Sequence, residues 1–73
     1  MEKFLNFVAD VMNVDSSEIS LDTEYGTYEK WDSLMMLSLV MELEAEYGVS
    51  IPMESVANIK TLKDLWLLVG GDR

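Results

Sequence analysis

Cysteine and histidine are absent from this sequence, and proline occurs once. Without cysteine there is no disulfide framework, no thiolate nucleophile and no cysteine ligand for zinc. Without histidine there is no Ser–His–Asp triad, and no side chain titrates near neutral pH at its unperturbed value. The chain is therefore not expected to be an enzyme, and carboxylate pairs such as Glu42 and Glu46 are interpreted as a solvated helix face. The acidic loop lacks EF-hand ligand spacing, so no metal site is predicted.

Long apolar runs and positive charge are also scarce. No window approaches the run of about 20 apolar residues that spans a bilayer, and the start of the chain lacks the features of a signal peptide. A cytoplasmic protein with no membrane partner is the default expectation. Five basic against 14 acidic residues give a formal net charge of −9. This charge repels nucleic acid and favours basic protein partners, with fast, salt-sensitive encounters.

The length of 73 residues suits one small domain, predicted to cover residues 1–73, with a monomer as the default state. Hydrophobic residues make up 49% of the sequence, which is ample for a packed core. Residues 2–13 place apolar side chains on one helical face and polar side chains on the other. Residues 14–31 are rich in turn formers and predict a long loop. Tyr25 and Tyr28 are interpreted as pins that hold this loop over the core, while the role of Trp31 is left open.

The clearest helix is predicted over residues 33–47, because Asp32 or Ser33 can cap its start and Gly48 can end it. A serine at such a position is ordinarily only a cap. If Asp32 is the cap, however, Ser33 lies in the first turn with its hydroxyl free. The helix dipole and the unpaired backbone N–H groups would then favour a phosphate ester there. The pattern is compatible with a modified serine.

The last part of the chain predicts two further helices. Pro52 keeps the residues before it extended, and a short helix follows over residues 53–58. Thr61 and Asp64 resemble a capping box and open a last helix that runs to Val69. The predicted fold class is all-α: a four-helix bundle of three main helices and a short third helix, with a long first loop.

Two apolar arcs appear on helix 33–47 when each residue is rotated by about 100° from the last. One arc is a full core stripe of Met36, Leu39, Val40, Leu43 and Tyr47. The other arc consists of Leu34, Leu37, Met41 and Ala45, bordered by Ser38, Glu42 and Glu46. A helix in so small a bundle needs only one stripe for its core. The second arc either packs under the loop or the short helix, or is exposed as a docking face for partners. Periodicity alone favours neither.

The segment Asp32-Ser33-Leu34 resembles the "DSL" signature of the acyl carrier protein family. Residues 39–52 (LVMELEAEYGVSIP) resemble the "LEEEFG…IP" run that follows this signature in the family. The order of helix, long loop, helix, short helix and helix is also similar, so the resemblance covers essentially the whole chain. It implies that Ser33, flanked by the signature residue Asp32, bears a 4′-phosphopantetheine group from coenzyme A.

The resemblance also implies a set of partners. A phosphopantetheinyl transferase would attach the group, with the Ser33 hydroxyl attacking the β-phosphorus of coenzyme A. The thiol of the attached arm would hold acyl or aminoacyl groups as thioesters. These would come from an activating ligase, a ketosynthase or an acyltransferase with basic docking patches. The implied partner face consists of Leu34, Leu37, Met41, Glu44 and Glu46, with the glutamates steering onto Lys/Arg patches.

Departures from the family's pattern refine this expectation. Trp31 precedes the signature, Met35-Met36 follow it, and Ser38 and Ala45 occupy positions that are commonly acidic. The "WDSL" form resembles stand-alone carriers of specialised acyl, aminoacyl or polyketide pathways more than carriers of central fatty acid synthesis. The alternative hypothesis is an unmodified acidic helical interaction module, an adaptor or an inhibitor, which gives no reason for Asp32-Ser33-Leu34.

Overall fold

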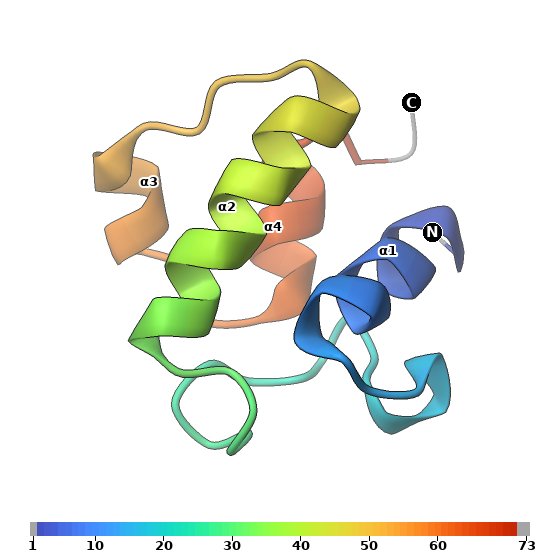
Figure 1. The fold of residues 1–73 in the computed structure, drawn as a ribbon. Helices are drawn as coiled ribbons and strands as arrows, with labels where there is room; N and C mark the ends of the chain where they lie inside the picture. Colours follow the sequence, from blue (N-terminus) through green and yellow to red (C-terminus); the bar gives the residue numbers. More distant parts are fainter. Residues whose placement is uncertain (1, 72–73) are drawn as a thin grey trace.

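The computed structural model describes residues 2–71, which form four α-helices and one short 3₁₀ helix (Figure 1). In chain order these are α1 (Glu2–Met12), η1 (Ser16–Glu18), α2 (Ser33–Tyr47), α3 (Met53–Ala57) and α4 (Leu62–Leu68). The predicted all-α class is confirmed, as is the order of the helices with a short third one. The domain prediction covers residues 1–73, of which 1 and 72–73 lie outside the described residues.

Helix bounds agree with the prediction to within one residue. Helix α1 ends at Met12 because Asn13 adopts a left-handed conformation with φ of 59°, and the N–H of Val14 donates back to the carbonyl of Ala9 at 3.0 Å. Thr61 is the N-cap of α4, and Asp64 completes the predicted capping box. Helix η1, inside the predicted loop, was not predicted.

The core lies between the helices and is built mainly from α1, α2 and α4, with single residues from the connections, while α3 and η1 bury no residue. Helices α1 and α3 lie on opposite sides of α2 (Figure 1). The residues that are buried share an apolar character: Phe4, Val8, Ala9, Met12, Ile19, Trp31, Met36, Leu39, Val40, Leu43, Ile51, Ile59, Leu62, Leu65 and Val69. No polar or charged residue of the described part of the chain is buried. The acidic side chains of residues 2–71 are therefore at least partly open to solvent.

The long loop is fastened to the α3–α4 connection by backbone hydrogen bonds. The N–H of Tyr25 donates to the carbonyl of Lys60 at 2.8 Å, and the N–H of Leu62 donates to the carbonyl of Thr23 at 3.1 Å. The N–H of Lys63 reaches the carbonyl of Leu21 at 2.9 Å. We call this pairing of residues 21–25 with residues 60–63 the seam. It ties the segment before Ser33 to the start of α4.

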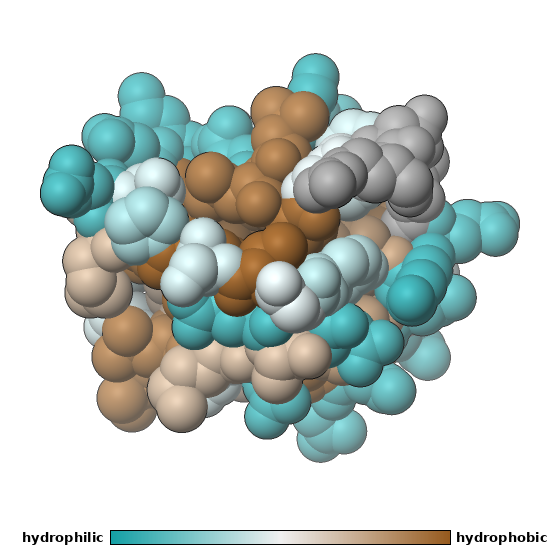
Figure 2. Space-filling view, turned by 90° about the horizontal axis from the view of Figure 1, so that it is seen from above, coloured by the Kyte–Doolittle hydropathy of each residue, from teal (hydrophilic) through white to brown (hydrophobic). Residues whose placement is uncertain are grey.

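Figure 2 shows the molecule from the end of the bundle at which α2 finishes. Apolar side chains gather near the middle of this face and again at its lower left, with hydrophilic side chains along much of the remaining edge. Helix α2 ends there at Gly48, whose φ of 63° is left-handed and whose N–H donates to the carbonyl of Glu44. Glycine suits this position because it reaches the left-handed region without steric cost. Gly48 therefore ends the helix as predicted.

Candidate functional site

Ser33 is the first residue of α2, and Asp32 is its N-cap. The Asp32 Oδ1 atom accepts a hydrogen bond from the N–H of Met35 at 2.8 Å, and the Asp32 carbonyl accepts from the N–H of Met36 at 2.8 Å. Asp32 therefore does the capping, which decides between the two candidate caps. The Ser33 side chain is exposed, and its hydroxyl makes no hydrogen bond to another described residue.

The first turn of α2 also leaves donors free. Among the described residues, neither the N–H of Ser33 nor that of Leu34 has an acceptor, and the turn holds no acidic side chain. These groups carry the positive end of the helix dipole, which favours an anion such as a phosphate. A phosphodiester on the Ser33 hydroxyl would lie next to them. The site therefore fits the phosphate end of phosphopantetheine.

The backbone N–H groups at the start of α4 have acceptors, unlike those of Ser33 and Leu34 at the start of α2. The Asp64 carboxylate accepts from the N–H of Lys60 at 2.8 Å and from the N–H of Thr61 at 3.1 Å. These two backbone hydrogen bonds lower the pKa of Asp64 below its ordinary value. The N–H groups of Leu62 and Lys63 in the first turn of α4 are also occupied, by the carbonyls of Thr23 and Leu21, whereas those of Ser33 and Leu34 in α2 have no acceptor among the described residues.

Trp31 fixes the position of the segment that leads into the site. Its side chain is fully buried, and the ring of Tyr25 packs edge-on against it with centroids 5.3 Å apart. The role of Trp31, which the sequence left open, is therefore that of a core anchor two residues before Ser33. Tyr28 is half-buried beside the core, and burial together with the charges of Glu18 and Glu29 raises its pKa.

A hollow of about 280 Å³ opens beside Ser33. Its walls come from the loop, from α2, from α3 and from the residues after α3: Tyr25, Ser33, Met36, Leu37, Val56, Ala57 and Ile59. We call it the Ser33 hollow. The sequence pattern did not place Tyr25, Val56 or Ile59 at the site. Their proximity to Ser33 depends on how distant segments pack, and the local pattern carries no signal for that.

The second apolar arc of α2 is exposed. Leu34 and Met41 have 76% and 68% of their surface open to solvent, and Ala45 is exposed as well. Leu37 is 46% exposed, since it lies on the side toward α3 and lines the Ser33 hollow. The arc therefore does not pack under the loop, and only Leu37 is near α3. We call Leu34, Leu37, Met41 and Ala45 the exposed face of α2.

The two glutamates of the predicted partner face have different surroundings. The Glu44 Oε2 atom accepts a hydrogen bond from the N–H of Ile51 at 2.7 Å, in a half-buried position. This bond ties the last turns of α2 to the connection that leads into α3. Glu46 is exposed and makes no side-chain hydrogen bond to the other described residues. Glu44 therefore has a structural contact that the sequence did not indicate, while Glu46 is free for other contacts.

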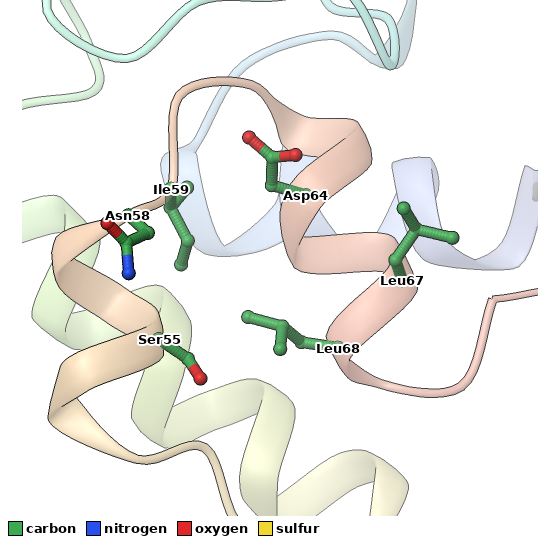
Figure 3. A pocket seen from close by; sticks show the side chains of 6 residues that line it. All are labelled: Ser55, Asn58, Ile59, Asp64, Leu67 and Leu68. Atoms are coloured by element: carbon green, nitrogen blue, oxygen red, sulfur yellow. The ribbon is translucent and has the colours of Figure 1, made fainter.

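A second groove, of about 290 Å³, lies between α3 and α4 (Figure 3). Ile59 and Leu68 point into it, with Ser55 and Asn58 along its α3 side. None of the predicted site residues lines it. Within residues 2–71, no cluster of three acidic, histidine or cysteine side chains could hold a metal ion. Within the same residues, no helix is long and apolar enough to cross a membrane.

Comparisons with known proteins agree with this geometry. A family model described as "Phosphopantetheine attachment site" matches residues 2–68. The acyl carrier protein of Rickettsia canadensis (strain McKiel) is 38% identical over 64 residues, which are 88% of this chain and 74% of that protein. The acyl carrier protein of Rickettsia typhi (strain ATCC VR-144 / Wilmington) is 36% identical over the same length and shares. These matches define a carrier of the phosphopantetheine-binding class.

More particularly, the chain belongs to the acyl carrier protein family. Its prosthetic group is 4′-phosphopantetheine, and the chain is a carrier that is not itself an enzyme. Such carriers work with partner enzymes, among them transferases and synthases. The family resemblance stated from the signature and from residues 39–52 is thereby confirmed.

Proposed function

We propose that Ser33 is the attachment site of 4′-phosphopantetheine and that the chain presents acyl or aminoacyl groups to partner enzymes in a specialised pathway. The observation that carries the proposal is that capping and exposure fall on two different residues at the start of α2. Asp32 caps the helix through the N–H of Met35, so the exposed Ser33 hydroxyl has no structural hydrogen bond to lose. A serine that is free of capping can be esterified without unravelling its helix.

The residues around Ser33 have defined tasks in this function. The N–H groups of Ser33 and Leu34 hold the negative charge of the phosphodiester at the positive end of the helix. Trp31 keeps the attachment point fixed against the core. When bound, the prosthetic group supplies the thiol that this cysteine-free chain lacks. Attachment to one site turns each later reaction into an encounter at high local concentration.

The proposed partner face comprises Leu34, Leu37, Met41, Glu44 and Glu46. Exposed apolar side chains bordered by acidic groups fit a basic surface with apolar pockets, because burial supplies affinity and charge supplies steering. The partners that match are a phosphopantetheinyl transferase, an activating ligase, a ketosynthase and an acyltransferase. Since Glu44 is held by Ile51, we assign the freer electrostatic contact to Glu46. All of these encounters are proposed to take place in the cytoplasm.

Loading with coenzyme A tests the attachment site. The protein, incubated with coenzyme A and a broad-specificity phosphopantetheinyl transferase, should gain the mass of one phosphopantetheine in intact-protein mass spectrometry. The Ser33→Ala variant should fold and stay unmodified. The matched control is Ser38→Ala, which removes another exposed serine hydroxyl of α2 and should still be modified.

Two outcomes would overturn the proposal. Modification of Ser33→Ala at another residue would show that the attachment site was misassigned. An unmodified wild type beside a fully converted control carrier would favour the acidic interaction module instead. In that case the Ser33→Ala variant should bind the module's partner as well as wild type does.

A further inference from the structure

Methionine provides the only sulfur of this cysteine-free chain, and its exposure differs sharply from one position to another. Met12 and Met36 are buried in the core, and Met35 is half-buried against it. Met41 and Met53, in contrast, have 68% and 67% of their surface open to solvent. A dissolved oxidant reaches an exposed thioether before a buried one. Met41 and Met53 are therefore the first of these five methionines to be oxidised.

The two exposed methionines lie on different surfaces. Met41 belongs to the exposed face of α2, one helical turn after Leu37 and one turn before Ala45. Met53 is the first residue of α3 and is not part of that face. Their exposures are nearly equal, so an oxidant distinguishes them little. The consequences differ, because only Met41 lies on the proposed partner face.

Oxidation changes the chemical character of the Met41 side chain. The oxidant is a hydroperoxide such as hydrogen peroxide. The sulfur lone pair attacks one peroxide oxygen, an S–O bond forms and the O–O bond breaks. The hydroxide that leaves takes the proton of the transferred oxygen and becomes water, so the sulfur loses two electrons and the peroxide gains them. A flexible apolar thioether thus becomes a polar sulfoxide.

The surroundings of Met41 make this change unfavourable for docking. Its neighbours along the exposed face, Leu37 and Ala45, are apolar. A partner that fits this face therefore presents apolar side chains to the position of Met41. Burying the sulfoxide oxygen against them, without a hydrogen-bond partner, opposes association.

The fold itself does not depend on the Met41 sulfur. The buried residues of α2 are Met36, Leu39, Val40 and Leu43, and Met41 is not among them. A sulfoxide on Met41 remains in solvent, so the folded state loses no core packing. The modification therefore acts on association and leaves the stability of the bundle in place.

We propose that Met41 is an oxidation site through which hydroperoxides weaken the docking of the carrier on its partner enzymes. The proposal rests on the proposed partner face and adds a reversible modification to it. Methionine sulfoxide reductases reverse the step. Two reductase thiols supply two electrons and two protons and form a disulfide, and the sulfoxide oxygen leaves as water.

Graded oxidation of the protein before phosphopantetheine attachment tests the proposal. The protein is treated with increasing hydrogen peroxide, catalase removes the remaining peroxide, and peptide mass spectrometry measures the sulfoxide at each methionine. Docking is measured as kcat/KM for modification by the phosphopantetheinyl transferase. We expect kcat/KM to fall about tenfold as Met41 is converted, while the circular dichroism spectrum stays helical. Treatment with the reductases for both sulfoxide epimers should restore kcat/KM.

Two variants separate the exposed methionines. Met41→Leu keeps an apolar side chain of similar volume but has no sulfur at the site. Its kcat/KM after peroxide should equal its own value before peroxide. Met53→Leu is the matched control, since it removes an equally exposed sulfur outside the partner face. Peroxide should lower its kcat/KM as much as that of wild type.

An undiminished kcat/KM with Met41 fully converted would overturn the proposal, as would an equal loss in Met41→Leu and wild type. Protection by Met53→Leu would also overturn it, because the sensitive sulfur would then lie on α3. Failure of the proposed function appears separately, before any oxidant is added. In that case the transferase does not modify untreated wild type, or it modifies untreated Met41→Ala as fast as wild type.

Discussion

Helix α2 has two apolar faces with opposite surroundings. The buried face consists of Met36, Leu39, Val40 and Leu43, and the exposed face consists of Leu34, Leu37, Met41 and Ala45. The residue types are nearly the same on both. The two faces differ in what surrounds them. Core residues of other helices and of the loop cover the buried face, whereas most of the exposed face is open to solvent. Similar side chains therefore stabilise the fold on one face and are available to partners on the other.

Truncation of one leucine on each face should give the largest contrast. Leu39 is fully buried, so Leu39→Ala removes core contacts and leaves a cavity, which costs about 2–5 kcal/mol of unfolding free energy. Leu34 is mostly exposed, so Leu34→Ala should change stability by no more than about 0.5 kcal/mol. Urea titrations followed by circular dichroism measure both values. Equal losses would mean that the two faces do not differ as described.

Binding should show the reverse order. Met41→Ala removes an exposed apolar side chain of the proposed partner face and should lower kcat/KM for transferase modification about tenfold, or ~1.4 kcal/mol. The control is Leu67→Ala, since Leu67 is also exposed but lies on α4, outside that face. Its kcat/KM should match wild type. If Leu67→Ala is impaired as much as Met41→Ala, the exposed face of α2 is not the binding surface.

The two glutamates near the end of α2 offer a smaller contrast. Glu44→Gln weakens the charge-assisted hydrogen bond to the N–H of Ile51 and should cost about 1 kcal/mol of stability. Glu46→Gln removes an exposed charge that has no hydrogen bond to the other described residues, so its stability should stay within about 0.5 kcal/mol of wild type. Thermal unfolding at fixed pH compares the two. A Glu46→Gln variant that is the weaker of the pair would contradict the assigned roles.

The smallest effect concerns the acidic border of the exposed face. Helix α2 contains Glu42, Glu44 and Glu46 but no basic residue, so these charges repel one another. Added salt screens this repulsion. The unfolding midpoint should therefore rise modestly between low and moderate ionic strength. The corresponding gain in the free energy of unfolding is on the order of a few tenths of a kcal/mol. A midpoint that does not rise with salt or divalent cations would count against repulsion on this helix.

The sequence predicted those parts of the molecule that depend on local chemistry. Residues 33–47 repeat apolar side chains at helical spacing, and Asp32 and Gly48 have the side-chain and backbone properties that begin and end a helix. The structure confirms these bounds. Four residues of the predicted core stripe, Met36, Leu39, Val40 and Leu43, are buried as the periodicity indicates. The fifth, Tyr47, is only half-buried at the end of α2, where its ring contacts Phe7.

Other features could not be predicted because their partners lie far apart in the chain. The seam is built from backbone N–H and carbonyl groups. Because all of residues 21–25 have such groups, the identity of their side chains gives little indication of the pairing. The Glu44 bond to Ile51 depends on the path of the chain after Gly48. The meeting of Tyr25 with Ile59 depends on the packing of the whole bundle. Periodicity describes one segment at a time and does not predict contacts between segments that are distant in the sequence.

The anchor at Trp31 has a mechanical consequence. Ser33 lies two residues after the buried Trp31 and is itself the first residue of α2. The attachment point is therefore held by the core on one side and by the helix on the other. The backbone at Ser33 is thus fixed in position relative to the bundle. The volume that a tethered group can sweep is then set by the length of its tether, while its origin stays fixed relative to the bundle.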